Sequence, residues 1–189
     1  CGRAADVQKE IQFVLEREQL AHTLVDLQDA GKLPLRVTHN DTKLNNIMID
    51  LETGKGICVV DLDTVMPGLA MNDFGDAIRF GASTALEDEK DLSKVSCDME
   101  LYEIYVKGFL ESCGDKLNAR EIEMLPMGAK VMTYECGIRF LTDYLEGDHY
   151  FKIDREDHNL DRCRTQFKLV ADMEQKWEQM QAIVKKYQK

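Results

Sequence analysis

The sequence has no apolar run long enough to cross a membrane as a helix. Its longest such stretch, residues 57–60, has the length of a strand, whereas a membrane span needs about 20 apolar residues. The first residues also lack the apolar core of a secretory signal peptide. Only 3 prolines and 12 glycines occur, and 44% of the residues are hydrophobic, which excludes collagen-like and disordered chains. We therefore expect a globular protein of the cytoplasm that binds no membrane.

Basic charge and metal-binding cysteine patterns are also scarce. The 24 Lys and Arg residues stand against 35 Asp and Glu residues, which gives a net charge of −11. Such an acidic surface argues against nucleic acid as a partner. The six cysteines show no CxxC pair or other metal-binding spacing. Several lie in apolar patterns, as reduced thiols do, which also favours a reducing compartment.

The first third of the chain predicts one helix and one hairpin. Residues 6–30 carry apolar side chains at helical spacing, with Gly31 as a plausible C-cap. Residues 46–50 and 57–61 are β-prone and flank a turn that contains Gly54. A loop over residues 62–72 follows the hairpin.

The rest of the chain is expected to be helical. The predicted helices cover residues 73–80 (with Asp73 as N-cap), 97–112, 119–145 (interrupted near Pro126) and 159–187. The predicted fold class is therefore α+β and mainly helical, with one small β-hairpin.

The loop before the hairpin holds the most unusual combination of residues. His39, Asp41 and Asn46 form the pattern H-x-D-x-x-x-x-N, and Asp61 ends the second predicted strand. Asp41 could accept a proton from a substrate hydroxyl, and His39 is expected to hold the loop through backbone hydrogen bonds. Because such residues are common in loops, a polar turn before an ordinary hairpin is the alternative interpretation.

The register of the hairpin brings two potential metal ligands together. If the hairpin is centred on Gly54, Ile47 faces Asp61, and Asn46 lies one residue from that pair. One amide and one carboxylate oxygen suit Mg²⁺, which keeps positions for water and phosphate. A base, two metal ligands and space for a nucleoside triphosphate are the layout of a phosphotransferase site.

This segment resembles the aminoglycoside phosphotransferase and choline kinase family, which has the protein-kinase-like fold. The resemblance implies that Asp41 is the catalytic residue, that Asn46 and Asp61 bind Mg²⁺, and that ATP is the phosphoryl donor. Residues 73–75 spell the kinase DFG motif, but Asp61 occupies the corresponding place in the family. Asp73 is therefore predicted to cap a helix and to steady the loop over residues 38–45, which carries Asp41 and is called the catalytic loop below.

Within that family, residues 37–46, 61–68, 73–81 and 137–152 look like the N-acetylhexosamine 1-kinase branch. The resemblance implies transfer to the anomeric hydroxyl of an N-acetylhexosamine, with Arg139 and Tyr150 contacting the sugar. Taken alone, Arg139 is better explained by an ion pair with Asp143 at i+4.

Supporting roles and other functions stay open at this stage. Lys43 could approach a phosphate or lie exposed, Asp63 and Arg79 could line the site or lock the loop, and Asp76 is expected to be structural. The acceptor could instead be choline, an aminoglycoside or another small alcohol. A non-catalytic binding module that keeps the fold is a further alternative.

The family's fold also implies an N-terminal nucleotide-binding lobe. No glycine-rich phosphate loop followed by strands, and no suitable strand lysine, precedes residue 38. We therefore expect residues 1–189 to be the C-terminal lobe alone, with the missing N-terminal lobe as its partner. By itself this lobe should transfer phosphate poorly or not at all.

Overall fold

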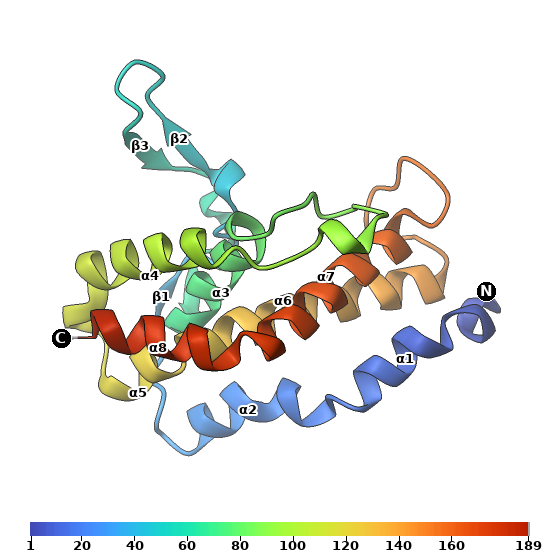
Figure 1. Ribbon diagram of the computed structural model, residues 1–189, viewed down its shortest axis with the longest axis horizontal. Helices are drawn as coiled ribbons and strands as arrows, with labels where there is room; N and C mark the ends of the chain where they lie inside the picture. Colours follow the sequence, from blue (N-terminus) through green and yellow to red (C-terminus); the bar gives the residue numbers. More distant parts are fainter. Residues whose placement is uncertain (189) are drawn as a thin grey trace.

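The computed structural model describes residues 1–188, which form a helical body and one projecting hairpin (Figure 1). The α-helices are α1 (Gln8–Leu15), α2 (Glu18–Asp29), α3 (Ala70–Gly81), α4 (Met99–Cys113), α5 (Ala119–Glu123), α6 (Leu125–Glu146), α7 (His158–Gln175) and α8 (Trp177–Tyr187). Strand β1 (Arg36–Thr38) pairs antiparallel with β4 (Met66–Gly68), and β2 (Ile47–Ile49) pairs antiparallel with β3 (Gly56–Val59). The predicted α+β, mainly helical class is confirmed.

Short 3-10 helices join several of these elements. They are η1 (Arg3–Val7), η2 (Leu44–Asn46), η3 (Leu62–Thr64), η4 (Leu92–Lys94) and η5 (Gly114–Lys116). Two of them, η2 and η3, stand at the base of the hairpin, where they connect it to the rest of the fold.

Several predicted boundaries are wrong. The helix expected over residues 6–30 is divided into η1, α1 and α2, and the one over 159–187 is divided at Lys176. The interruption expected near Pro126 is confirmed and lies at Met124, between α5 and α6. The loop expected over 62–72 contains β4, whose partner β1 lies 30 residues away in the register Arg36↔Gly68 to Thr38↔Met66. Pairing over that distance leaves no local signal in the sequence.

Helices α3 and α6 cross in close contact because both carry glycine at the crossing. A Cβ atom on Gly75 would lie 2.3 Å from the carbonyl oxygen of Gly128, and one on Gly128 would lie 2.2 Å from the carbonyl oxygen of Met71. Any larger residue would force the helices apart. Since α3 carries Asp73 in its first turn, this crossing fixes the position of that carboxylate.

Two apolar clusters fill the helical body. One surrounds Phe74 and Tyr102 between α3, α4, α6 and α8, and the other surrounds Tyr134 and Phe167 between α2, α6 and α7. Helix α6 contributes to both, so it is the central element of the fold. None of the helices within residues 1–188 is long and apolar enough to span a membrane.

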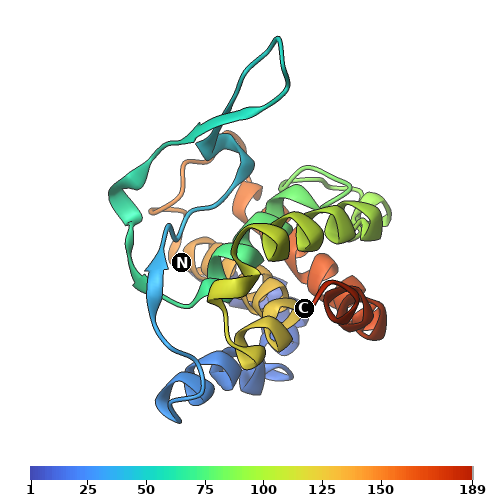
Figure 2. The ribbon, with the colours of Figure 1, turned by 90° about the vertical axis from the view of Figure 1, so that its left-hand side faces the viewer.

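The hairpin β2–β3 extends away from this body (Figures 1 and 2). Every residue of both strands is exposed, including apolar ones such as Met48 and Ile57. Ile47 lies opposite Val59, so the predicted pairing of Ile47 with Asp61 is wrong.

The turn explains this difference in register. The Asp50 side chain accepts hydrogen bonds from the backbone N–H groups of Glu52 and Thr53, at 3.1 and 2.7 Å. The backbone N–H of Asp50 donates to the Lys55 carbonyl at 2.8 Å. These bonds close the turn over residues 51–54, and an irregularity follows between Met48 and Ile49. The midpoint of the hairpin therefore lies before Gly54 instead of at it.

Candidate active site

The loop that carries Asp41 is anchored by Asp73. Its Oδ2 atom accepts the backbone N–H of His39 at 2.8 Å, and its Oδ1 atom accepts that of Asn40 at 2.7 Å. The hydroxyl of Thr42 donates to the Asp73 carbonyl at 2.5 Å. Helix α3 has Leu69 as its N-cap and begins at Ala70, so the prediction of Asp73 as an N-cap is wrong. Its carboxylate binds the catalytic loop instead of its own helix.

Asn40 and Thr64 tie the same loop to η3. Asn40 has a left-handed backbone with φ of 64°, which asparagine tolerates better than most residues. Its side-chain Nδ2 donates to the Thr64 carbonyl at 2.9 Å, and the Thr64 hydroxyl donates to the His39 carbonyl at 2.6 Å. Our sequence reasoning missed both residues. The only available signal was an asparagine at a position where the chain must turn.

His39 connects the catalytic loop to the end of β3. Its Nε2 lies 3.0 Å from the Val60 carbonyl, and its Nδ1 lies 3.3 Å from the backbone N–H of Asp41. The carbonyl can only accept and the N–H can only donate, so this network assigns the proton to Nε2. The ring therefore makes the backbone contacts that were expected of it.

Asp41 and Asn46 are in direct contact. The Oδ2 atom of Asp41 accepts hydrogen bonds from Lys43 Nζ and from Asn46 Nδ2, both at 2.8 Å. Asn46 Nδ2 also donates to the Asp41 carbonyl at 2.8 Å. Both protons of the amide are thus used on Asp41. The amide oxygen Oδ1 is the part of the buried Asn46 side chain that remains for a cation.

These contacts set the charge of Asp41. Partial burial tends to raise the pKa of its carboxyl, but the hydrogen bonds from Lys43 and Asn46 and the charge of Lys43 outweigh burial and hold that pKa below its usual value. The group is therefore a carboxylate at neutral pH. An ionised carboxylate is the form that can accept a hydroxyl proton.

Asp61 stands at the same end of the hairpin as Asn46. The backbone N–H of Val60 donates to the Asn46 carbonyl at 2.9 Å, so Asp61 directly follows the residue that Asn46 binds. Asp61 is exposed, and its left-handed backbone (φ 63°) turns the chain from β3 into η3. Its carboxylate and the Asn46 amide oxygen are the hard oxygen ligands that Mg²⁺ prefers.

Few side chains near Asn46 and Asp61 could act as metal ligands. Within residues 1–188, no group of three or more His, Cys, Asp or Glu side chains is arranged to hold a metal ion. Mg²⁺ usually keeps several waters and binds through one or two carboxylates plus substrate phosphates. In chemical type, the Asn46 amide oxygen and the Asp61 carboxylate fit such a Mg²⁺ ion.

Arg139 and Tyr150 lie together near the C-terminal end of α6. The Arg139 Nη2 atom is 3.5 Å from the Tyr150 hydroxyl, and its guanidinium carbon is 5.8 Å from the centre of the Tyr150 ring. The Arg139 Nη1 atom also lies 4.0 Å from Oε1 of Glu135. Asp143 is buried and binds the following turn, so the alternative pairing of Arg139 with Asp143 is wrong.

The remaining supporting residues lie in different surroundings. Arg79 donates from Nε and Nη2 to Asp76 Oδ1 at 3.1 and 2.9 Å, and from Nη1 to Glu87 at 2.5 Å. It therefore joins α3 to the loop that follows, and among the described residues it forms no hydrogen bond or ion pair with the loop of Asp41. Asp63 is exposed in η3.

The catalytic loop, the hairpin and α3 all lie within a region that matches a known family. The sequence model of the phosphotransferase enzyme family (APH) matches residues 1–102, which is more than half of the chain. The chain belongs to this family. Membership in the phosphotransferase family identifies a kinase-type enzyme that acts on small molecules.

The extent of the phosphotransferase match divides the site into two parts. Asp41, Asn46 and Asp61 lie inside the matched residues, whereas Arg139 and Tyr150 lie outside them. The family model therefore covers the part of the chain to which the sequence assigns phosphoryl transfer. The choice of acceptor rests on the geometry of α6 and the turn after it.

Proposed function

We propose that this phosphotransferase uses ATP and Mg²⁺ to phosphorylate a small-molecule hydroxyl, with the anomeric hydroxyl of an N-acetylhexosamine as the favoured acceptor. The observation that carries the proposal is the contact between Asp41 and Asn46. It holds an ionised carboxylate beside an amide whose oxygen remains for a cation.

Asp41 orients and deprotonates the acceptor hydroxyl. Its Oδ2 atom accepts both side-chain hydrogen bonds, and no hydrogen bond within residues 1–188 reaches Oδ1, which is left for the hydroxyl proton. Lys43 supplies positive charge 2.8 Å from this carboxylate, where it can offset negative charge that develops during transfer. Asn46 and Asp61 would hold Mg²⁺, which offsets negative charge on the phosphates when bound.

The acceptor is assigned to the surface formed by Arg139 and Tyr150. The guanidinium is a rigid fork of donors that suits sugar oxygens. The tyrosine adds an apolar ring face and a hydroxyl. Both side chains are exposed, so an acceptor can reach them without displacing other residues.

The hairpin supports a further part of the proposal. Its exposed apolar side chains, such as Met48, Ile57 and Val59, form a surface of the kind that packs against a nucleotide base or another domain. We assign the nucleotide and an N-terminal lobe to this surface. On this proposal residues 1–189 alone transfer phosphate poorly.

The test uses the full-length open reading frame with Mg²⁺-ATP. ADP release is followed with N-acetylglucosamine, N-acetylgalactosamine, choline and an aminoglycoside, and Asp41→Asn serves as the catalytic control. Turnover with an N-acetylhexosamine that the variant loses supports both the base and the acceptor. Turnover with another acceptor only would keep Asp41, Asn46 and Asp61 but remove the sugar roles of Arg139 and Tyr150.

Absence of ADP release is the outcome that favours a non-catalytic binding module. If the folded full-length protein releases no ADP with any of these acceptors, the proposal that it phosphorylates one of them fails. Binding of the same sugars by a protein that releases no ADP would then indicate a non-catalytic member of the family.

A further inference from the structure

The turn after α6 is organised by one buried carboxylate. Asp143 is 3% exposed. Its Oδ1 atom accepts the backbone N–H groups of His149 and Tyr150, both at 2.8 Å. Its Oδ2 atom accepts the backbone N–H of Phe151 at 2.9 Å and the side-chain Nδ2 of Asn159 at 2.8 Å. Three consecutive backbone donors and one side chain therefore converge on a single side chain.

The place of Asp143 in its own helix is unfavourable. It lies in the last turn of α6, which ends at Glu146, and a negative charge is disfavoured at that end of the helix dipole. Burial adds a desolvation cost. Burial tends to raise the pKa of Asp143, but the hydrogen bonds from the turn and from Asn159 lower it below its usual value. The turn and Asn159 of α7, and not α6, therefore supply the stabilisation of this carboxylate.

The same turn is further constrained on both sides. Gly147 and Asp148 have left-handed backbones, with φ of 108° and 62°, which reverse the chain. Asn159 Nδ2 also donates to Asp148 at 2.9 Å. The Phe151 ring packs on the ring of Phe140, with centroids 4.7 Å apart. The backbone of Tyr150 is therefore held between fixed neighbours.

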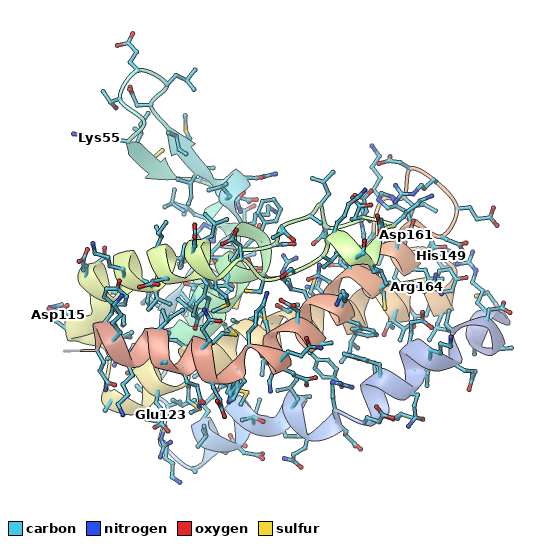
Figure 3. All side chains as sticks on the ribbon, in the orientation of Figure 1. Lys55, Asp115, Glu123, His149, Asp161 and Arg164 are labelled. Carbon is cyan, nitrogen blue, oxygen red and sulfur yellow. The ribbon has the colours of Figure 1, made fainter. Side chains whose placement is uncertain are left out.

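The side chain of Tyr150 is exposed although its backbone is held. Its exposed fraction is 73%, and its hydroxyl is near Arg139. Figure 3 shows the turn, with His149 labelled, projecting from the helical body near Asp161 of α7. An exposed aromatic side chain on a rigid backbone loses little entropy when it contacts a ligand.

We propose that Asp143 is a positioning residue that fixes Tyr150, and through Tyr150 also Arg139, in the place where the acceptor binds. The carboxylate holds the backbone N–H groups of residues 149–151 and contacts no substrate itself. The effect on the acceptor rests on the proposed function, whereas the hold on the turn does not.

The first experiment measures backbone hydrogen exchange in the 189-residue chain. Asp143→Asn keeps the shape of the side chain but removes its charge and replaces one acceptor oxygen by a donor. We expect the amides of His149, Tyr150 and Phe151 to exchange at least tenfold faster, while those in the middle of α7 stay protected. Unchanged exchange at residues 149–151 would overturn the proposal.

Asp172→Asn is the matched control. Asp172 is also buried, and it accepts the backbone N–H of Cys97 at 2.7 Å and the Ser96 hydroxyl at 3.1 Å. Its loss should weaken the fold without selective exchange at residues 149–151. If Asp143→Asn does not fold, Asn159→Ala removes one donor and leaves Asp143 in place. It should increase exchange at the same amides, though less, and no increase there would overturn the proposal.

The second experiment uses kinetics of the full-length protein. Asp143→Asn should raise the KM of the acceptor about tenfold and leave the KM of ATP within twofold. In a Tyr150→Ala background the same substitution should change the acceptor KM by less than twofold, because the residue it positions is gone. Additive effects would show that Asp143 does not act through Tyr150 and would overturn the proposal. If the wild-type protein uses no acceptor, the proposed function fails, while the exchange experiment still decides whether Asp143 holds the turn.

Discussion

The Oδ2 atom of Asp73 lies 2.8 Å from the backbone nitrogen of His39, a residue 34 positions earlier in the chain. Asp73 is carried by α3, and α3 is fixed on α6 by the contact between Gly75 and Gly128. The position of the catalytic loop therefore depends on how two helices of the body pack.

Asp73→Ala should lower kcat of the full-length enzyme by 10- to 100-fold. The substitution leaves the N–H groups of His39 and Asn40 without their acceptor, so the loop that carries Asp41 loses its anchor. We also expect a loss of about 1–3 kcal/mol in the free energy of unfolding, the usual value for a hydrogen-bonded charged group. Steady-state kinetics and urea unfolding measure the two effects.

Asp98→Ala is the control for this prediction. Asp98 also accepts two backbone N–H groups, those of Glu100 and Leu101 at the start of α4. Its loss should cost about 1 kcal/mol of stability, as for other helix caps, with kcat unchanged. Equal kcat for the two variants would refute the anchoring role of Asp73.

Gly75→Ala should destabilise the protein by about 2 kcal/mol or more. The added methyl group would lie 2.3 Å from the Gly128 carbonyl oxygen, and overpacking of this kind costs about 1–3 kcal/mol. Gly108→Ala in α4 is the opposite case, since nothing lies within 4 Å of the added atom. It should stabilise the protein by about 0.5–1 kcal/mol. Thermal or urea unfolding compares the two, and equal stability would contradict the close crossing.

Lys43→Met should raise the pKa of Asp41. Hydrogen bonding from Lys43 and Asn46, with the charge of Lys43, holds this pKa below its usual value against the effect of burial. In the wild-type enzyme, activity that needs the Asp41 carboxylate is lost only as the pH falls through this lowered pKa. Without Lys43 the acidic limb of kcat/KM should move to higher pH.

The same lowered pKa has a consequence for stability. The carboxylate stabilises the folded state above the pKa of the unfolded chain, and this contribution is lost as the pH falls through the folded pKa. A carbon-13 NMR titration of the Asp41 carboxyl in the 189-residue chain measures the shift. Lys55→Met, on the exposed hairpin just before β3 (Figure 3), is the control and should leave the titration unchanged.

Asp61→Asn should raise the Mg²⁺ concentration needed for half-maximal turnover by at least tenfold. An amide is a weaker ligand than a carboxylate for a hard cation. Glu52→Gln removes a charge from the turn of the same hairpin, where the side chain is exposed, and should leave this concentration unchanged. A similar change in both variants would mean that Asp61 acts only through the general charge of the hairpin.

Much of this protein could be predicted from short stretches of sequence. Helical periodicity, the turn around Gly54 and the H-x-D-x-x-x-x-N pattern depend on residues within a few positions of one another. They were sufficient for the mainly helical class, for the hairpin and for the choice of Asp41, Asn46 and Asp61 as the residues of interest.

The tertiary structure decided the features that depend on distant partners. The fold placed the Asp73 carboxylate against the backbone of Asn40, and the Asp143 carboxylate against the turn that carries Tyr150. A carboxylate in a sequence shows only that it can accept hydrogen bonds. Which backbone donors it meets depends on how the helices pack, and for α3 and α6 that packing is set by two glycines 53 residues apart.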